Sequence, residues 1–127
     1  MASRFLLPEN VARRDGDGAV IALDAARGKL LLLTLGITRI LEAESLEVSI
    51  WGSPDSKTNQ RNWKLLGSFP PKNYCGNYSL ILDLSRRPEI AYVRAAWKMA
   101  RWNRKSEPLF GFYLFAEELL LRTAGAA

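Results

Sequence analysis

Apolar and polar residues alternate along four separate segments of this chain. The segments are residues 45–53, 77–83, 92–101 and 110–117, and clusters of Gly, Pro, Asn and Ser separate them. Successive side chains of a strand point to opposite faces of a sheet, so this alternation is typical of antiparallel strands with one face on a core and the other in water. We therefore expect an all-β fold, an antiparallel β-sandwich of the jelly-roll type with about seven or eight strands.

Residues 29–41 are apolar on both faces in the first half of the segment. A strand that is buried on both sides has this pattern, so we expect a strand in the middle of a sheet, or one that bends at Gly36 and changes partners. A helix is disfavoured in this segment, because glycine and threonine are poor helix formers. Shorter strands are expected over residues 19–24 and 63–69.

Both ends of the chain are predicted to lie outside the regular sandwich. Residues 1–14 are expected to form an extended N-terminal arm with a short strand around residues 5–6. The β-sandwich domain is expected over residues 15–123, and residues 124–127 are expected to be a frayed tail. A short helix is predicted at residues 117–122, because glutamate near its start and arginine near its end match the helix dipole.

The chain is long and apolar enough to fold as one domain. It has 127 residues, 48% of them hydrophobic, so it can bury a core without metals or cross-links. Cys75 is the single cysteine, which excludes an intramolecular disulfide. The apolar runs are too short for the core of a signal peptide or for a membrane-spanning helix. We therefore expect a cytoplasmic protein with no membrane partner.

The chain contains no histidine. Because histidine titrates near neutral pH and is the commonest metal ligand, its absence disfavours triad hydrolysis, imidazole acid–base catalysis and most zinc sites. Glu42 and Glu44 are predicted to be solvated rather than a catalytic pair, and Cys75 to be a structural thiol. Residues 15–18, Asp-Gly-Asp-Gly, are predicted to form a turn rather than a calcium loop. We therefore expect a protein that is not an enzyme and binds no cofactor or metal.

Basic residues are concentrated in the middle of the chain. Residues 57–105 hold eleven basic and two acidic residues, whereas the rest of the chain holds seven basic and eleven acidic residues. Such asymmetry can attract an acidic protein, nucleic acid or the acidic face of a second copy. A solvated sheet face that carries arginine and lysine is the simpler alternative.

Several aromatic residues are predicted to face outward among these basic residues. Trp97 alternates with apolar neighbours and is expected in the core, whereas Trp51 and Trp102 fall on the polar register of their strands. An outward tryptophan can stack on a sugar or a base, or fill a protein interface. The predicted partner-binding residues are Trp51, Arg61, Trp63, Lys64, Arg94, Lys98, Arg101, Trp102, Arg104 and Tyr113.

Five features of the chain carry a resemblance to known proteins. They are GAV at residues 18–20, LLLTLGIT at residues 31–38, LEVSIWGSPD at residues 46–55, Trp63, and YVRAAWK at residues 92–98. Together they resemble small β-sandwich proteins of tailed bacteriophages and prophages, over residues 18–116. The segment PLFGFY is also similar to one in a group of uncharacterised bacterial proteins. The resemblance implies a non-enzymatic assembly protein and transfers no catalytic residue.

Two functions follow as expectations. The first is a structural or interaction protein that forms a homo-oligomer, or docks on an acidic protein partner or a larger complex such as a phage-like particle. Its location would then be the cytoplasm or a virion-like particle. The alternative is a ligand-binding module for nucleic acid or carbohydrate that uses a basic, aromatic surface.

Overall fold

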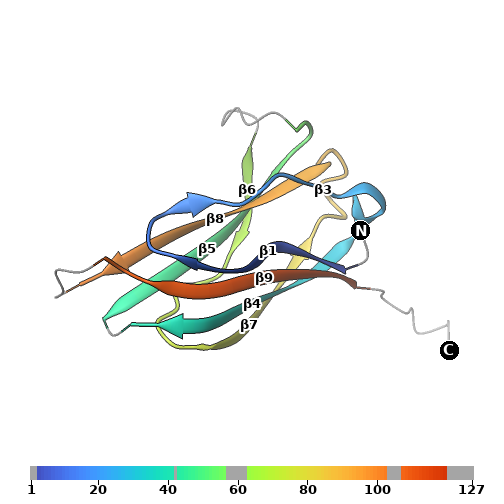
Figure 1. Ribbon diagram of the computed structural model, residues 1–127. Helices are drawn as coiled ribbons and strands as arrows, with labels where there is room; N and C mark the ends of the chain where they lie inside the picture. The colour runs from blue at the N-terminus through green and yellow to red at the C-terminus, as the bar shows by residue number, and fades with distance from the viewer. Residues whose placement is uncertain (1–2, 42, 57–62, 103–106, 120–127) are drawn as a thin grey trace, which may run out of the picture.

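The computed structural model describes residues 3–41, 43–56, 63–102 and 107–119. Within these ranges the chain forms two antiparallel sheets that pack face to face (Figure 1), which confirms the predicted β-sandwich. The elements are β1 (Ser3–Ala12), β2 (Gly16–Asp17), β3 (Ile21–Ala22), the 3-10 helix η1 (Asp24–Ala26), β4 (Leu30–Ile40), β5 (Glu44–Ser53), β6 (Lys64–Ser68), β7 (Gly76–Asp83), β8 (Tyr92–Arg101) and β9 (Phe110–Leu119).

The strand order places distant parts of the sequence side by side. One sheet has the order β1-β9-β4-β7, and the other has the order β2-β8-β5-β6 with β3 also paired to β8. Strand β4 is therefore central, as its two apolar faces predicted. Its pairing with β9 runs without interruption past Gly36 and shifts register between Ile37 and Arg39.

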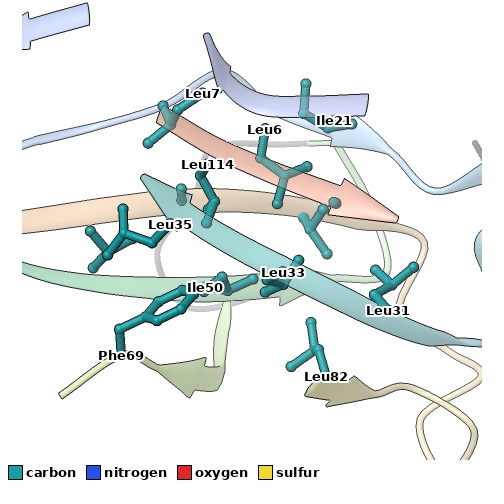
Figure 2. Packing of buried hydrophobic residues seen from close by; sticks show 14 of the residues in the cluster. Leu6, Leu7, Ile21, Leu31, Leu33, Leu35, Ile50, Phe69, Leu82 and Leu114 are labelled. Atoms are coloured by element: carbon teal, nitrogen blue, oxygen red, sulfur yellow. The ribbon is translucent and has the colours of Figure 1, made fainter. Parts of the chain in front are cut away.

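The core lies between the two sheets and is built from the inward rows of the alternating strands. Figure 2 shows Leu33 and Leu35 of β4 in this layer, and they share one hydrophobic cluster with Ile50 of β5 and with Phe69. Strand β9 contributes four fully buried residues in the predicted register, which are Phe110, Phe112, Leu114 and Ala116. The period of two therefore identified the inner faces correctly.

The N-terminal segment is part of the sandwich and is not an arm. Strand β1 forms one edge of its sheet and pairs with β9 from Ser3 to Ala12. A register shift between Phe5 and Leu7 lets two consecutive residues, Leu6 and Leu7, both be buried. Such a bulge breaks the simple alternation, which is why the sequence pattern indicated only a short strand around residues 5–6 and not the whole of β1.

The predicted C-terminal helix is also corrected by the structure. Glu117 and Leu119, which open the expected helix, continue β9 and pair with Leu32 and Leu30 of β4. The ladder to β4 provides these residues with backbone hydrogen bonds, and this outweighs the weak preference of a short helix for charges near its ends. Residues 120–122, and the expected tail at residues 124–127, lie outside the described residues.

Candidate binding groove

A groove of about 560 Å³ runs over the outer face of the β2-β8-β5-β6 sheet. We call it the tryptophan groove, because three of the chain's four tryptophans line it. Its volume lies in the range of about 300–1,000 Å³ that is usual for small-molecule sites. The lining residues are Asp15, Gly16, Asp17, Ser49, Trp51, Trp63, Arg94, Ala96, Trp97 and Lys98.

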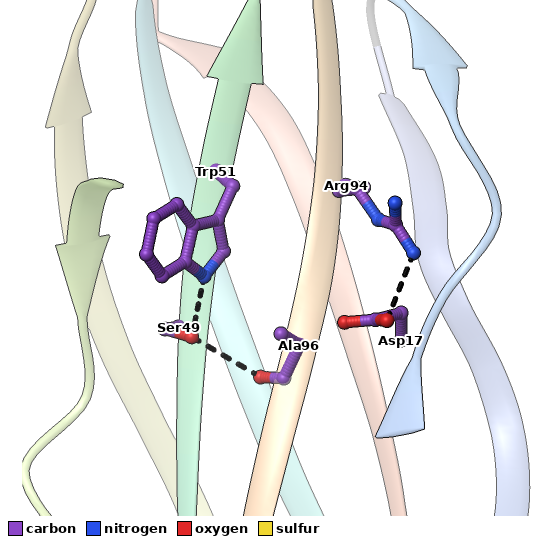
Figure 3. A network of polar contacts seen from close by, with 5 residues as sticks. All are labelled: Asp17, Ser49, Trp51, Arg94 and Ala96. Atoms are coloured by element: carbon purple, nitrogen blue, oxygen red, sulfur yellow. Dashed lines mark hydrogen bonds and ion pairs between the residues drawn. The ribbon is translucent and has the colours of Figure 1, made fainter. Parts of the chain in front are cut away.

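The outward register of β5 and β8 supplies the floor of the groove. Trp51 and Arg94 are cross-strand partners, and Ser49 and Ala96 form the next outward pair (Figure 3). The indole Nε1 of Trp51 donates a hydrogen bond of 2.9 Å to Ser49 Oγ, and this hydroxyl donates one of 3.5 Å to the Ala96 carbonyl. These bonds hold the half-buried indole of Trp51 in a defined orientation over the sheet.

Arg94 connects both sides of the groove. Its Nη2 lies 3.0 Å from Asp17 Oδ2, and its guanidinium carbon lies 5.5 Å from the centre of the Trp63 ring. The Arg94 side chain is 19% exposed, whereas that of Asp17 is 57% exposed. Among the described residues, Arg94 Nε is buried and has no hydrogen-bond partner. A planar guanidinium suits this position, because it can pair with a carboxylate and stack on an aromatic face at once.

The segment predicted as an Asp-Gly-Asp-Gly turn forms one wall of the groove. Its central residues are strand β2, which pairs with Trp97 and Ala96 of β8. Asp15 Oδ1 accepts a hydrogen bond of 2.7 Å from the Met99 amide, and a Cβ added to Gly16 would lie 2.7 Å from the Trp97 ring. A glycine is therefore needed at position 16, because the backbone passes directly over the indole.

Trp97 belongs to the core and to the groove. Its ring packs edge to face against Phe112 at 5.6 Å, as the predicted core position requires. The residue is only half buried, and its Nε1 donates a hydrogen bond of 2.8 Å to the Arg14 carbonyl at the rim of the sheet. The remaining ring surface lines the groove.

The groove brings together only part of the predicted partner-binding set. Trp51, Trp63, Arg94 and Lys98 line it, although Trp63 is buried to 8% exposure beneath the arginine. Lys64 is exposed on the edge strand β6 and does not line the groove.

The other predicted residues lie elsewhere. Trp102 is exposed beyond the end of β8, and Arg101 donates a hydrogen bond of 2.8 Å to the Glu107 carbonyl. Tyr113 lies on the other sheet and donates a hydrogen bond of 3.1 Å to Asn77 Oδ1. Arg61 and Arg104 lie outside the described residues. The basic, aromatic set is therefore not one continuous surface.

Sequence reasoning missed six of the ten lining residues, which are Asp15, Gly16, Asp17, Ser49, Ala96 and Trp97. Ser49 has the same parity as Trp51, so the period of two could have identified it. Asp15 and Asp17 were assigned to a turn, and Trp97 was assigned wholly to the core. No local signal indicates that the two aspartates meet β8, because this pairing joins segments about 80 residues apart in the chain.

Glu44 is buried at 1% exposure, which corrects its predicted position on the solvated surface. Its carboxylate accepts hydrogen bonds from the amides of Leu41, at 2.8 Å, and Leu109, at 3.0 Å. It therefore ties the end of β4 to the segment that enters β9. Its neighbour in the predicted pair, Glu42, lies outside the described residues.

Features that would indicate other chemistry are few in the part of the chain that the structure describes. In these ranges no group of three or more His, Cys, Asp or Glu residues is placed to hold a metal ion. Cys75, predicted as a structural thiol, is exposed. None of the described helical segments has the length and apolar character needed to cross a bilayer.

Comparison with protein-family models and with curated protein sequences finds no match to this chain. The resemblance to phage proteins therefore stays a prediction. The fold and the groove define the protein as a β-sandwich with an aromatic, charged groove on the outer face of one sheet.

Proposed function

We propose that this protein is a non-enzymatic binding protein that holds its ligand in the tryptophan groove. The observation that carries the proposal is the meeting of three tryptophans with the Arg94–Asp17 pair in one groove. Groups that are mounted on paired strands are held more rigidly than groups on loops, so the groove is organised before a ligand arrives.

The contacts of the polar groups in the groove support binding rather than catalysis. Arg94 is paired with Asp17, and Asp15 accepts a hydrogen bond from a backbone amide. The only hydroxyl among the lining residues, that of Ser49, is engaged with the Trp51 indole and a backbone carbonyl. A nucleophile requires an adjacent base, and no such pair occurs among the lining residues.

Nuclear magnetic resonance of the tryptophan indoles tests this proposal. The indole N–H signals of Trp51 and Trp97 report on the groove, whereas the signal of the exposed Trp102 serves as an internal control. Neutral oligosaccharides, single-stranded oligonucleotides and acidic peptides would be titrated separately. We expect one class to shift the two groove signals and to lose binding in Trp51→Ala but not in Trp102→Ala. Binding that is equal in both variants, or absent for all classes, would overturn the proposal.

A second candidate function is self-assembly or docking on a larger complex, such as a phage-like particle. The outer face of the β1-β9-β4-β7 sheet favours it, because Phe5 is 47% exposed and Ile81 is 61% exposed on that face. Phe115 extends the apolar surface, with its ring 4.8 Å from that of Phe5. Exposed apolar residues that gather on one face are typical of interaction sites.

Light scattering tests this second candidate. We expect the protein to form a defined homo-oligomer at high concentration, and the doubly substituted protein with Phe5→Ser and Ile81→Ser to be monomeric. The matched control is Trp51→Ala, which alters the opposite sheet and should leave the oligomer unchanged. A wild-type protein that stays monomeric at every concentration would contradict self-assembly.

A further inference from the structure

We infer that the ligand of the tryptophan groove is a neutral oligosaccharide. The inference rests on the proposed function and adds the chemical class of the ligand. The charge balance of the lining residues, the engagement of their hydrogen-bonding groups and the exposed aromatic surface all lead to it.

The charges that line the groove cancel, although the chain as a whole has a net charge of +5. The two cations are Arg94 and Lys98, and the two anions are Asp15 and Asp17. Nucleic acid is held chiefly by cations that neutralise its phosphates, and an acidic peptide requires a similar excess of positive charge. A polyanion in this groove would lie against the half-exposed Asp17 carboxylate, so the groove favours an uncharged ligand.

The arginine that could have bound a phosphate is already engaged. Arg94 is paired with Asp17 and stacked on Trp63, and only 19% of its side chain is exposed. A phosphate would have to displace the carboxylate to form a bidentate contact with the guanidinium. Asp17 still presents acceptor oxygens to the groove. Sugar hydroxyls can donate to such oxygens without breaking the ion pair, because each hydroxyl is both donor and acceptor.

The aromatic groups offer apolar surface rather than hydrogen-bond donors. The indole N–H groups of Trp51 and Trp97 donate to Ser49 Oγ and to the Arg14 carbonyl. What these half-buried rings leave for a ligand is therefore carbon surface. The C–H face of a pyranose ring packs well on such a surface, while the hydroxyls at its edge reach the polar groups beside it. In Figure 3 the Trp51 indole and the Arg94 side chain rise from the neighbouring strands β5 and β8, and Ser49 and Ala96 form the next pair along these strands.

Calorimetric titration at low and high salt tests the inference. The probes are gluco-, manno-, xylo- and chito-oligosaccharides, a single-stranded oligothymidylate and a polyglutamate peptide. We expect a neutral oligosaccharide to bind with a Kd that changes less than about twofold between about 0.05 and 0.5 M salt, because no counterions are released. The Kd should rise about tenfold or more in Trp51→Ala, because an aromatic stacking contact is lost.

Matched variants distinguish the loss of a ligand contact from the unfolding of the variant protein. Trp51→Phe keeps an aromatic ring and should retain most of the affinity, and Asp17→Asn should weaken binding about five- to tenfold by removing a charged acceptor. Trp102→Ala, outside the groove, should bind as the unchanged protein does. The thermal unfolding of each variant confirms that the protein tested is folded.

The outcomes distinguish the inference from the function on which it rests. If no saccharide binds but the oligonucleotide or the peptide binds in a Trp51-dependent, salt-sensitive manner, the ligand class is wrong and the binding function stands. If none of the probes binds in a Trp51-dependent manner, both fail. If a saccharide binds equally well to Trp51→Ala and Trp102→Ala, the site lies elsewhere, and both the inference and the groove function are overturned.

Discussion

The ring of Tyr113 lies directly over Gly36, its cross-strand partner on β4. Its hydroxyl continues across the central strand and donates a hydrogen bond of 3.1 Å to Asn77, the partner of Gly36 on the other side. One side chain of β9 thus covers the gap left by the glycine and connects β9 to β7. The sequence placed Tyr113 in a partner-binding set, but its contacts within the sheet give it a structural role.

We expect Gly36→Ala to destabilise the fold by about 1–3 kcal/mol, because a methyl group there would overlap the Tyr113 ring and displace it. Tyr113→Phe removes only the hydrogen bond to Asn77 and should cost about 0.5–1.5 kcal/mol. Urea denaturation measures both values. If Gly36→Ala is as stable as the unchanged protein, the close approach of ring and backbone does not constrain position 36.

Glu44 is predicted to be needed for stability rather than for binding. Glu44→Ala leaves the Leu41 and Leu109 amides without their acceptor and should cost about 1.5–3 kcal/mol in the free energy of unfolding. Glu44→Gln keeps one acceptor oxygen and should cost less. Glu47→Ala, on the exposed face of the same strand, is the matched control and should stay within about 0.5 kcal/mol of the unchanged protein. Equal effects at positions 44 and 47 would contradict this role.

The neighbouring residues Leu6 and Phe5 test whether β1 belongs to the core. Leu6 is 2% exposed, so Leu6→Ala should cost about 2–4 kcal/mol through lost burial and a residual cavity. Phe5 is 47% exposed and contacts Tyr113 and Phe115 edge to face, so Phe5→Ala should cost about 0.5–1.5 kcal/mol. Thermal or urea unfolding compares the two variants. A loose arm would instead make both changes nearly neutral.

The pKa of the Asp83 carboxyl is predicted to depend on its hydrogen bonds with Ser85. Hydrogen bonds from the hydroxyl and the amide of Ser85 hold the pKa of Asp83 below its ordinary value. Because the folded pKa is lowered, the stabilisation is present above the ordinary pKa and is lost as the pH falls through the folded pKa. We expect Ser85→Ala to raise the pKa of Asp83, as followed by carboxyl-carbon resonances. Ser79→Ala, on the same strand's exposed face, should leave it unchanged.

The strands and their inner faces were predictable because alternation is a local property. Val93 and Ala95 of β8, and Phe112 and Leu114 of β9, have the buried register that the period of two indicated. Where a bulge breaks the alternation, as at Leu6 of β1, the same reasoning recovered only a short strand and not its full length. The helix predicted from residue 117 onward was also wrong. The intrinsic helix preference of a short segment stabilises it less than pairing with an existing strand does.

The groove was predictable only in pieces. The outward parity of Trp51 and the basic character around Arg94 could be read along the chain, but neither shows that the two are cross-strand partners. The contact of Arg94 with Asp17 and Trp63 depends on the strand order β2-β8-β5-β6. Strand order is a long-range choice that a single sequence leaves open.

The alternation of residues along the chain was therefore sufficient to predict an antiparallel β-sandwich, its main strands and most of its core, because each strand must bury one face. The absence of histidine from the sequence was sufficient to disfavour histidine-dependent chemistry. The tertiary structure decided that β1 is the edge strand of its sheet and that Glu44 is buried between two backbone amides. It also decided that three tryptophans and an ion pair share one groove. These features arise where segments far apart in the sequence come together, and no local pattern encodes which segments those are.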